Sequence, residues 1–198
     1  GCPAVEYITK LDIGTSFDAA RISKKFKYPI QIDENEKYFL VMVHPDTTDE
    51  NDVDMDKVLE IVSRFGFKAF IFYPNIDANN TEIVSSIARY NNNDSFFMIR
   101  HMPLEDFVHT MAHCVCMIGN SSSGIRESAS FAIPFINIGE RQIGRERNKN
   151  TIDIDNDYGK LESTIKICMN QDIDNNNIYY QENCSSRIAA TIANYIGV

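Results

Sequence analysis

Short apolar runs alternate with amphipathic stretches along most of the chain. The first run, residues 37–43, is almost continuously apolar, as expected for a strand that is covered on both faces. Similar short runs predict further strands over residues 68–73, 95–99, 115–118, 135–138 and 151–154.

The segments between these runs carry apolar residues at helical spacing. Apolar side chains at positions 55, 58, 59, 62 and 65 predict a helix over 53–65, and Gly66 is a natural stop. Further helices are predicted over residues 18–26, 81–90, 103–113, 124–131, 158–169 and 185–196, with a polar surface loop over 172–177. This alternation predicts an α/β fold with a Rossmann-like, doubly wound parallel sheet and right-handed crossovers.

Length and composition favour one globular domain. The chain has 198 residues, of which 43% are hydrophobic and 24% charged, so we expect most of it to be ordered. The apolar runs are too short to span a membrane, and no apolar leader opens the chain. Because the first residue is Gly1 rather than methionine, we expect a fragment or a processed product.

The charge balance argues against a nucleic-acid-binding protein. There are 28 acidic and 19 basic residues, which give a net charge of −9, whereas nucleic-acid-binding proteins usually show a basic face. A small anionic ligand held by a local basic cluster stays compatible with this balance. The five cysteines are odd in number and form no Cys-x-x-Cys pair, which predicts free thiols in a reducing cytoplasm.

Polar residues follow each of the first five predicted strands, at the ends where ligands bind in doubly wound sheets. These strand ends are His44-Pro45, Tyr73-Pro74-Asn75, Arg100-His101-Met102-Pro103, Gly119-Asn120-Ser121-Ser122-Ser123-Gly124 and Gly139-Glu140-Arg141-Gln142-Ile143-Gly144-Arg145. We interpret this concentration as the main sign of a binding site.

The glycine- and serine-containing loop over 119–124 is the most specific of these strand ends. A strand, such a loop and a helix place main-chain N–H groups at a positive helix end, which suits a phosphate or diphosphate. The loop matches neither a Walker motif nor Gly-x-Gly-x-x-Gly, so ATP and NAD are not implied. An ordinary serine-capped helix start explains the local sequence equally well.

Charged residues near this loop have two interpretations each. Glu127, one turn into the predicted helix, would accept hydrogen bonds from ribose hydroxyls, or would only be a favourable charge in a first helical turn. Arg126, Arg141 and Arg145 would offset anionic charge, or would belong to a solvated loop that carries both signs.

The histidines divide in the same way. His44 precedes a proline and is therefore held extended, with ligand binding and packing both open as its role. His109 and His113 lie four residues apart, but no third metal ligand is fixed by spacing, so we expect a partly exposed helix face and predict no metal. No cofactor is predicted either.

Several stretches together resemble one enzyme family. They are Gly1-Cys2-Pro3, His44-Pro45-x-Thr47-Thr48-Asp49, Pro74-Asn75-Ile76-Asp77-Ala78, His101-x-Pro103-x-x-x-Phe107, Met117-Ile118-Gly119-Asn120-Ser121-Ser122-x-Gly124-x-Arg126-Glu127 and Arg141-Gln142-Ile143-Gly144-Arg145-Glu146. In this order they resemble the hydrolysing UDP-N-acetylglucosamine 2-epimerases, and most of all the branch that feeds sialic acid synthesis. The likeness covers nearly the whole chain.

The resemblance implies one half of a glycosyltransferase-B type fold. Residues 1–36 would then be the inter-domain linker with the first helix, and residues 37–198 the C-terminal Rossmann-like domain that binds UDP. It implies that Ser121 and Ser122 hold the diphosphate, that Arg141 supports the phosphate side and that Glu127 takes the ribose hydroxyls. His44 would lie nearest the sugar–phosphate bond and act in catalysis; the other residues implied to bind UDP are Asn75, His101, Met102, Asn120 and Arg126.

The family's reaction eliminates UDP to leave 2-acetamidoglucal, which is then hydrated to N-acetylmannosamine. Its catalytic carboxylates come from the N-terminal domain, so this chain would bind the leaving group without turnover and would need that domain as its partner. The resemblance further implies a cytoplasmic enzyme that is a homo-oligomer when intact. Two departures are Glu140, where the family has a small or neutral residue, and Tyr179-Tyr180-Gln181-Glu182, where it has Tyr-Gly-Asp-Gly.

Two alternatives stay open. One is a UDP-sugar-dependent glycosyltransferase domain of the same fold. The other is a free-standing module that binds a nucleotide without catalysis.

Overall fold

A computed structural model describes residues 1–26, 29–33, 35–46, 52–76 and 80–197. Six strands form one sheet in the order β3-β2-β1-β4-β5-β6, and every neighbouring pair is parallel. The strands are β1 (Tyr38–Met42), β2 (Lys68–Phe72), β3 (Phe96–Ile99), β4 (Met117–Gly119), β5 (Phe135–Ile138) and β6 (Thr151–Ile154). The predicted doubly wound parallel sheet is therefore confirmed.

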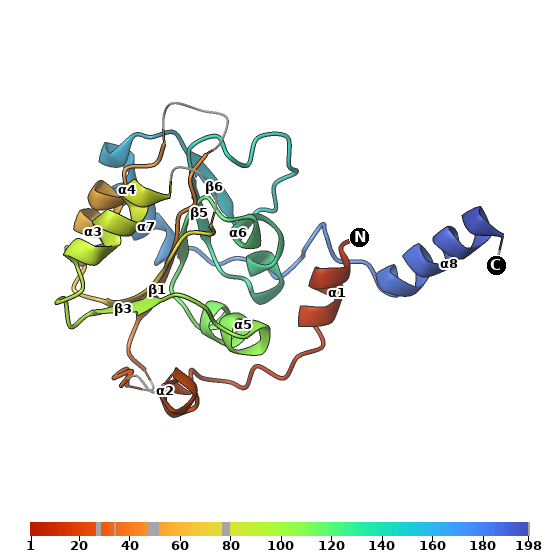
Figure 1. The fold of residues 1–198 in the computed structure, drawn as a ribbon, viewed down its shortest axis with the longest axis horizontal. Helices are drawn as coiled ribbons and strands as arrows, with labels where there is room; N and C mark the ends of the chain where they lie inside the picture. Colours follow the sequence, from red (N-terminus) through yellow and green to blue (C-terminus); the bar gives the residue numbers. More distant parts are fainter. Residues whose placement is uncertain (27–28, 34, 47–51, 77–79, 198) are drawn as a thin grey trace.

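Helices cover both faces of the sheet (Figure 1). One face packs against α3 (Met55–Ser63), α4 (Thr81–Arg89) and α7 (Tyr158–Cys168), and the other against α2 (Ala19–Phe26), α5 (Leu104–Ala112) and α6 (Ser122–Arg126). Side chains of β1 alternate between the two cores: Phe39 and Val41 lie in the first, and Tyr38 and Leu40 in the second. Both cores need apolar residues, which explains the uninterrupted apolar run in the sequence.

The strand order reverses between β1 and β4. Leu40 pairs with Met117 and Met42 with Gly119, while β1 pairs on its other side with β2. In parallel sheets such a switch point opens a crevice at the carboxyl ends of the strands. The polar strand ends found in the sequence all lie along this edge.

The helix predicted over residues 124–131 is wrong in its bounds. Helix α6 starts at Ser122 and ends at Arg126, and a 3₁₀ turn follows over Ser128–Phe131. The buried Ser128 explains the break, because its hydroxyl donates to the Gly124 carbonyl at 2.7 Å and accepts a bond from the Asn150 amide at 2.7 Å. These tertiary contacts tighten the chain after one helical turn.

The two ends of the chain meet through helices α1 (Pro3–Ile8) and α8 (Cys184–Ile196). The sequence pattern did not predict α1. Glu6 accepts hydrogen bonds from the main-chain N–H of Ser185 at 2.9 Å and from its hydroxyl at 3.0 Å, and with Lys10 these bonds lower the pKa of Glu6 to about 2. Beyond this contact α8 projects away from the body of the domain (Figure 1).

None of the described helices has the length and apolar character needed to cross a membrane.

His109 is buried rather than partly exposed, so the expected exposed helix face is wrong there. Its Nε2 accepts a bond from the Asp18 N–H at 2.9 Å, and its Nδ1 lies 2.9 Å from the Ile13 carbonyl. The ring is 3% exposed and stacks on Phe17. Because Nε2 accepts and Nδ1 faces an oxygen, the neutral ring holds residues 13–18 against α5.

Because His109 is held neutral, we predict that the free energy of unfolding decreases as the pH falls below the pKa of a free histidine. Burial lowers the pKa of His109, so at acidic pH the unfolded chain binds a proton that the folded chain does not. The loss begins near pH 6.5, with a slope of at most about 1.4 kcal/mol per pH unit. Urea unfolding between pH 7.5 and 5.5 measures it.

The variant His109→Gln should be less stable at pH 7.5 but show a shallower dependence over this range. His113→Gln is the matched control on the same helix and should keep most of the wild-type slope, because burial, the largest cause of the lowered His109 pKa, is unchanged. An unchanged slope in His109→Gln would remove His109 as the cause.

Candidate functional site

A pocket of about 330 Å³ lies at the carboxyl ends of β1, β2, β3 and β4. It brings together seven of the ten residues that the sequence predicted for the site. They are His44, Asn75, His101, Met102, Ser121, Ser122 and Arg141. The lining also contains Tyr73, Arg100 and Ser123, which belong to the predicted strand ends. Three further lining residues, Met42, Phe72 and Phe107, were not among the predicted site residues.

The pocket is polar and basic in an acidic chain. Its described lining has two arginines, two histidines and three serines, and none of these lining residues is an aspartate or glutamate. The whole chain carries a net charge of −9. A lining whose described residues are basic and polar, without a carboxylate among them, suits an anionic ligand.

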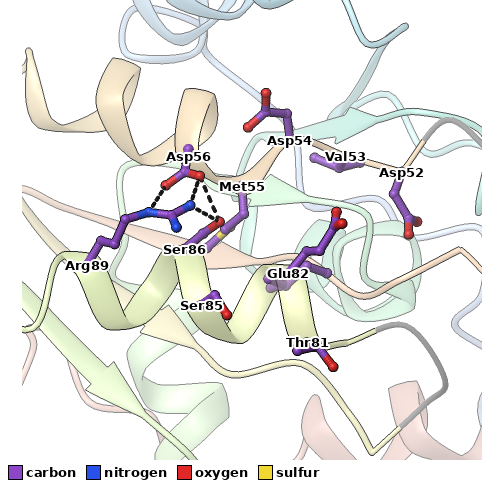
Figure 2. Close-up of a pocket in the computed structure, with 11 residues that line it drawn as sticks. Asp52, Val53, Asp54, Met55, Asp56, Thr81, Glu82, Ser85, Ser86 and Arg89 are labelled. Carbon is purple, nitrogen blue, oxygen red and sulfur yellow. Dashed lines mark hydrogen bonds and ion pairs between the residues drawn. The ribbon is translucent and has the colours of Figure 1, made fainter.

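A second hollow has the opposite character. It has a volume of about 450 Å³ and lies between α3 and α4 (Figure 2). Asp52, Asp54, Asp56 and Glu82 line it, and Arg89 is paired there with Asp56. An anion therefore has a favourable site at the strand ends and an unfavourable one here.

His44 is fixed at both its main chain and its ring. The Asn120 side chain accepts a bond from the His44 N–H at 2.7 Å and donates one to its carbonyl at 2.8 Å. The main-chain N–H of Asn75 donates to Nδ1 of the ring at 3.2 Å. His44 is 6% exposed, so its imidazole enters the pocket as a rigid group.

Asn120 itself lies behind the pocket. It is 1% exposed, and its carbonyl accepts bonds from Gln142 Nε2 at 2.7 Å and from Arg141 Nη1 at 3.3 Å. Arg141 also donates to the Pro45 carbonyl at 3.3 Å. The loops after β1, β4 and β5 are thus joined around one asparagine, a role for Gln142 that no spacing in the sequence could indicate.

Ser121, Ser122 and Ser123 line the pocket at the start of α6. Ser121 caps the helix, with its Oγ accepting a bond from the Ser123 N–H at 3.3 Å, and the Ser122 hydroxyl accepts one from Arg126 at 3.4 Å. Because α6 spans five residues, a long helix dipole does not contribute here. The hydroxyls of Ser121, Ser122 and Ser123 can contact an anion from this side of the pocket.

Glu127 caps the C-terminus of α6 and does not sit in a first helical turn, so that expectation is wrong. It is 8% exposed, its Oε1 lies 3.5 Å from Arg126 Nη2, and its buried Oε2 has no hydrogen-bond partner among the described residues. Burial raises the pKa of this carboxyl despite Arg126 and Arg145 nearby. A buried carboxylate oxygen without a partner is costly unless a ligand donates to it.

The part of the pocket beside β3 combines Met102 with flat side chains. Met102 is 8% exposed, and its Sδ lies 3.5 Å from Thr110 Oγ1. Arg100 stacks over the Tyr73 ring at 4.5 Å, and the exposed His101 lines the same pocket. This part of the pocket suits a flat, partly apolar group.

Parts of two quoted motifs fall outside the described residues, namely Thr47, Thr48, Asp49, Asp77 and Ala78. Within the described ranges, no three histidine, cysteine, aspartate or glutamate side chains gather as metal ligands. The five cysteines are free thiols.

Residues 5–193 match a family model described as UDP-N-acetylglucosamine 2-epimerase. The chain is 30% identical over 141 residues to the UDP-N,N'-diacetylbacillosamine 2-epimerase (hydrolyzing) of Legionella pneumophila, a match that covers 70% of this chain and 37% of that protein. It is 32% identical over 125 residues to the UDP-N-acetylglucosamine 2-epimerase of Neisseria meningitidis serogroup B, covering 61% of this chain and 32% of that protein.

Solved structures share the fold. The Neisseria meningitidis UDP-GlcNAc 2-epimerase bound to UDP-GlcNAc aligns with a TM-score of 0.67 at 14% identity, over 88% of this chain and 48% of that one. The S. aureus MnaA co-structure with UDP aligns with a TM-score of 0.65 at 15% identity, over 98% of this chain and 52% of that one. The chain therefore spans about half of these structures and less than half of its curated relatives.

Proposed function

We propose, because this chain belongs to the UDP-N-acetylglucosamine 2-epimerase family, that it forms the UDP-binding half of a hydrolysing 2-epimerase. The observation that supports this most is the pocket at the switch point, with two arginines, two histidines and three serines and no carboxylate among its described lining residues. A nucleoside diphosphate suits both sides of this pocket, because its diphosphate is anionic and its base is flat and partly apolar.

Different residues would bind the diphosphate and the ribose of UDP. Ser121 and Ser122 would donate to the diphosphate, and Arg141 would balance its charge. Glu127 would accept both ribose hydroxyls, which supplies the partner that its buried oxygen lacks among the described residues. The remaining contacts are proposed for Asn75, His101, Met102 and Arg126, with His44 nearest the bond between sugar and phosphate.

The reaction would run in two steps in the intact protein. A base removes the proton at C2 of the sugar, the C1–O bond breaks, and its electron pair leaves with the diphosphate, which yields UDP and 2-acetamidoglucal. Water then adds across the double bond and gives N-acetylmannosamine. The catalytic carboxylates would come from an N-terminal domain, which is the partner that we propose for this chain.

The biological setting is part of the same proposal. Relatives include a protein named polysialic acid biosynthesis protein P7 from Escherichia coli, 28% identical over 170 residues. This name and the family resemblance support a cytoplasmic, homo-oligomeric enzyme that supplies sugars of the sialic acid type. The division into a linker over residues 1–36 and a nucleotide-binding domain over 37–198 stays a prediction.

Calorimetric titration with UDP and ADP tests the binding function directly. We expect saturable binding with a preference for UDP, and the variant Arg141→Gln should weaken UDP binding by about 10- to 100-fold, since a hydrogen bond to a charged group contributes about 1.5–3 kcal/mol. Binding of uridine, which has no phosphate, should change little.

Arg89→Gln is the matched control, because Arg89 lies in the acidic hollow of Figure 2 and should not affect UDP. Equal affinity for ADP and UDP, or equal effects of the two arginine variants, would contradict the proposal. In the full-length protein, formation of a glycoside in place of free N-acetylmannosamine would identify a glycosyltransferase instead.

A further inference from the structure

Asn120 continues the pairing between β1 and β4 beyond the last strand residues. The strands end their register at Met42 and Gly119, and the Asn120 side chain then takes over the role of a partner strand. Its Oδ1 accepts from the His44 N–H at 2.7 Å and its Nδ2 donates to the His44 carbonyl at 2.8 Å. The main chain of His44 is therefore held by two short bonds just where it enters the pocket.

The polar groups of Asn120 are all engaged away from the pocket. Its side-chain amide is occupied by His44, and its carbonyl accepts from Gln142 at 2.7 Å and Arg141 at 3.3 Å. The residue is 1% exposed and does not line the pocket. An effect of Asn120 on a ligand must therefore pass through the residues that it holds.

The ring of His44 has a defined tautomer. Its Nδ1 accepts the Asn75 N–H at 3.2 Å, and a nitrogen that accepts a hydrogen bond carries no proton. The single proton of the neutral ring therefore sits on Nε2. This state depends on the ring staying beside Asn75, which in turn depends on where the His44 main chain is held.

We propose that Asn120 is a positioning residue that acts through His44, holding its imidazole against the Asn75 N–H so that Nε2–H is donated to the leaving diphosphate. The identity of the acceptor rests on the proposed function. As the C1–O bond breaks and its electron pair moves to the diphosphate oxygen, His44 shares its proton in a hydrogen bond and keeps it. His44 then stabilises the developing charge as a neutral donor.

The first test needs no nucleotide. Long-range ¹H–¹⁵N correlation of the imidazole nitrogens in the ¹⁵N-histidine-labelled chain reports the tautomer, and His44→Gln assigns the signal by its loss. We expect the Nε2-protonated neutral form in the wild type and a mixture of tautomers in Asn120→Ala. A Nδ1-protonated ring, or an Asn120→Ala spectrum identical to the wild type, would overturn the proposal.

The second test is a double-mutant cycle on UDP affinity. Asn120→Ala and His44→Ala should each weaken UDP binding by about tenfold, and the double variant should lose little more than either one. Asn120→Asp, which keeps the acceptor for the His44 N–H, should recover part of the loss. The exposed Asn91, which precedes β3 at the opposite edge of the sheet, supplies the control Asn91→Ala.

Additive losses in the cycle would overturn the proposal, since they would mean that Asn120 contacts the nucleotide itself. If Asn120→Ala fails to fold by circular dichroism, Asn120→Asp takes its place in both tests. A wild-type chain that binds no UDP would contradict the proposed function, whereas the tautomer measurement would still decide the role of Asn120.

Discussion

Gly119→Ala is expected to cost more than about 4 kcal/mol of folding free energy, a large share of the roughly 5–15 kcal/mol that stabilises a typical domain. Gly119 ends β4 with φ of +138°, a conformation that side chains rarely adopt. A Cβ there would overlap the Met42 carbonyl oxygen and lie 2.6 Å from its carbon. Because Met42 is its partner in the sheet, neither backbone can move without breaking the β1–β4 pairing.

Gly66→Ala separates the steric overlap with Met42 from the energetic cost of placing alanine at positive φ. Gly66 also has positive φ, +67°, but a Cβ at this position would meet no atom within 4 Å, so the substitution should cost only about 1–2 kcal/mol. Urea unfolding followed by far-UV circular dichroism compares the two. Equal losses would show that the close approach at the switch point is not what requires glycine.

Glu127→Ala is expected to weaken UDP binding by at least about 100-fold, because two charge-assisted hydrogen bonds to the ribose would be lost. The substitution should also remove the discrimination between UDP and 2′-deoxy-UDP. Calorimetry with both nucleotides measures this. An unchanged preference for the ribonucleotide would place the ribose elsewhere.

Glu127→Gln should weaken binding and yet stabilise the free protein at pH 7. Burial raises the pKa of Glu127, so the folded state loses stability as the pH rises from the unfolded value near 4.5, and the full penalty is reached above the raised value, where the buried carboxyl must ionise. An uncharged amide avoids the penalty, and we expect a gain of about 1 kcal/mol, or about 2–4 °C in Tm. The gain should vanish below about pH 4.5, where the unfolded carboxyl is also protonated.

Glu140→Gln is the control for this pair of effects. Glu140 is an exposed carboxylate in the loop that carries Arg141, and its replacement should leave Tm unchanged within about 1 °C. A stabilisation equal to that of Glu127→Gln would point to net charge rather than to burial.

The sheet could be predicted from sequence because its strands have marked ends. The runs over 135–138 and 151–154 are observed as β5 (Phe135–Ile138) and β6 (Thr151–Ile154), with Pro134 before the first and Gly139 after it. Burial on both faces leaves a local apolar signal that needs no knowledge of the partners.

Elements that depend on distant partners could not be predicted. Helix α1 spans only Pro3–Ile8 and is held by Ser185 near the other end of the chain. The break after α6 depends on Ser128 and Asn150. The burial of His109 comes from residues 13–18 folding across it, and neither its spacing nor its neighbours in sequence carry that information.

The candidate site shows the same division. The strand ends predicted where a site would form, and seven of the ten predicted site residues line one pocket. What the sequence could not indicate is which polar groups face each other: Asn120 turns its amide to His44, and Gln142 turns to Asn120. Both arrangements depend on the exact register of β1, β4 and the loop after β5.

The pairing of β1 with β4 also constrains how the chain can fold during its synthesis. Strands β1, β2 and β3 emerge from the ribosome and can pair before β4 is made. Leu40 of β1 pairs with Met117 of β4, which is synthesised 77 residues later. Until then β1 is an apolar edge strand with unpaired backbone groups, the kind of edge that recruits other chains. Strand β1, which leads into His44, is thus an edge that needs protection by a chaperone until β4 has been made.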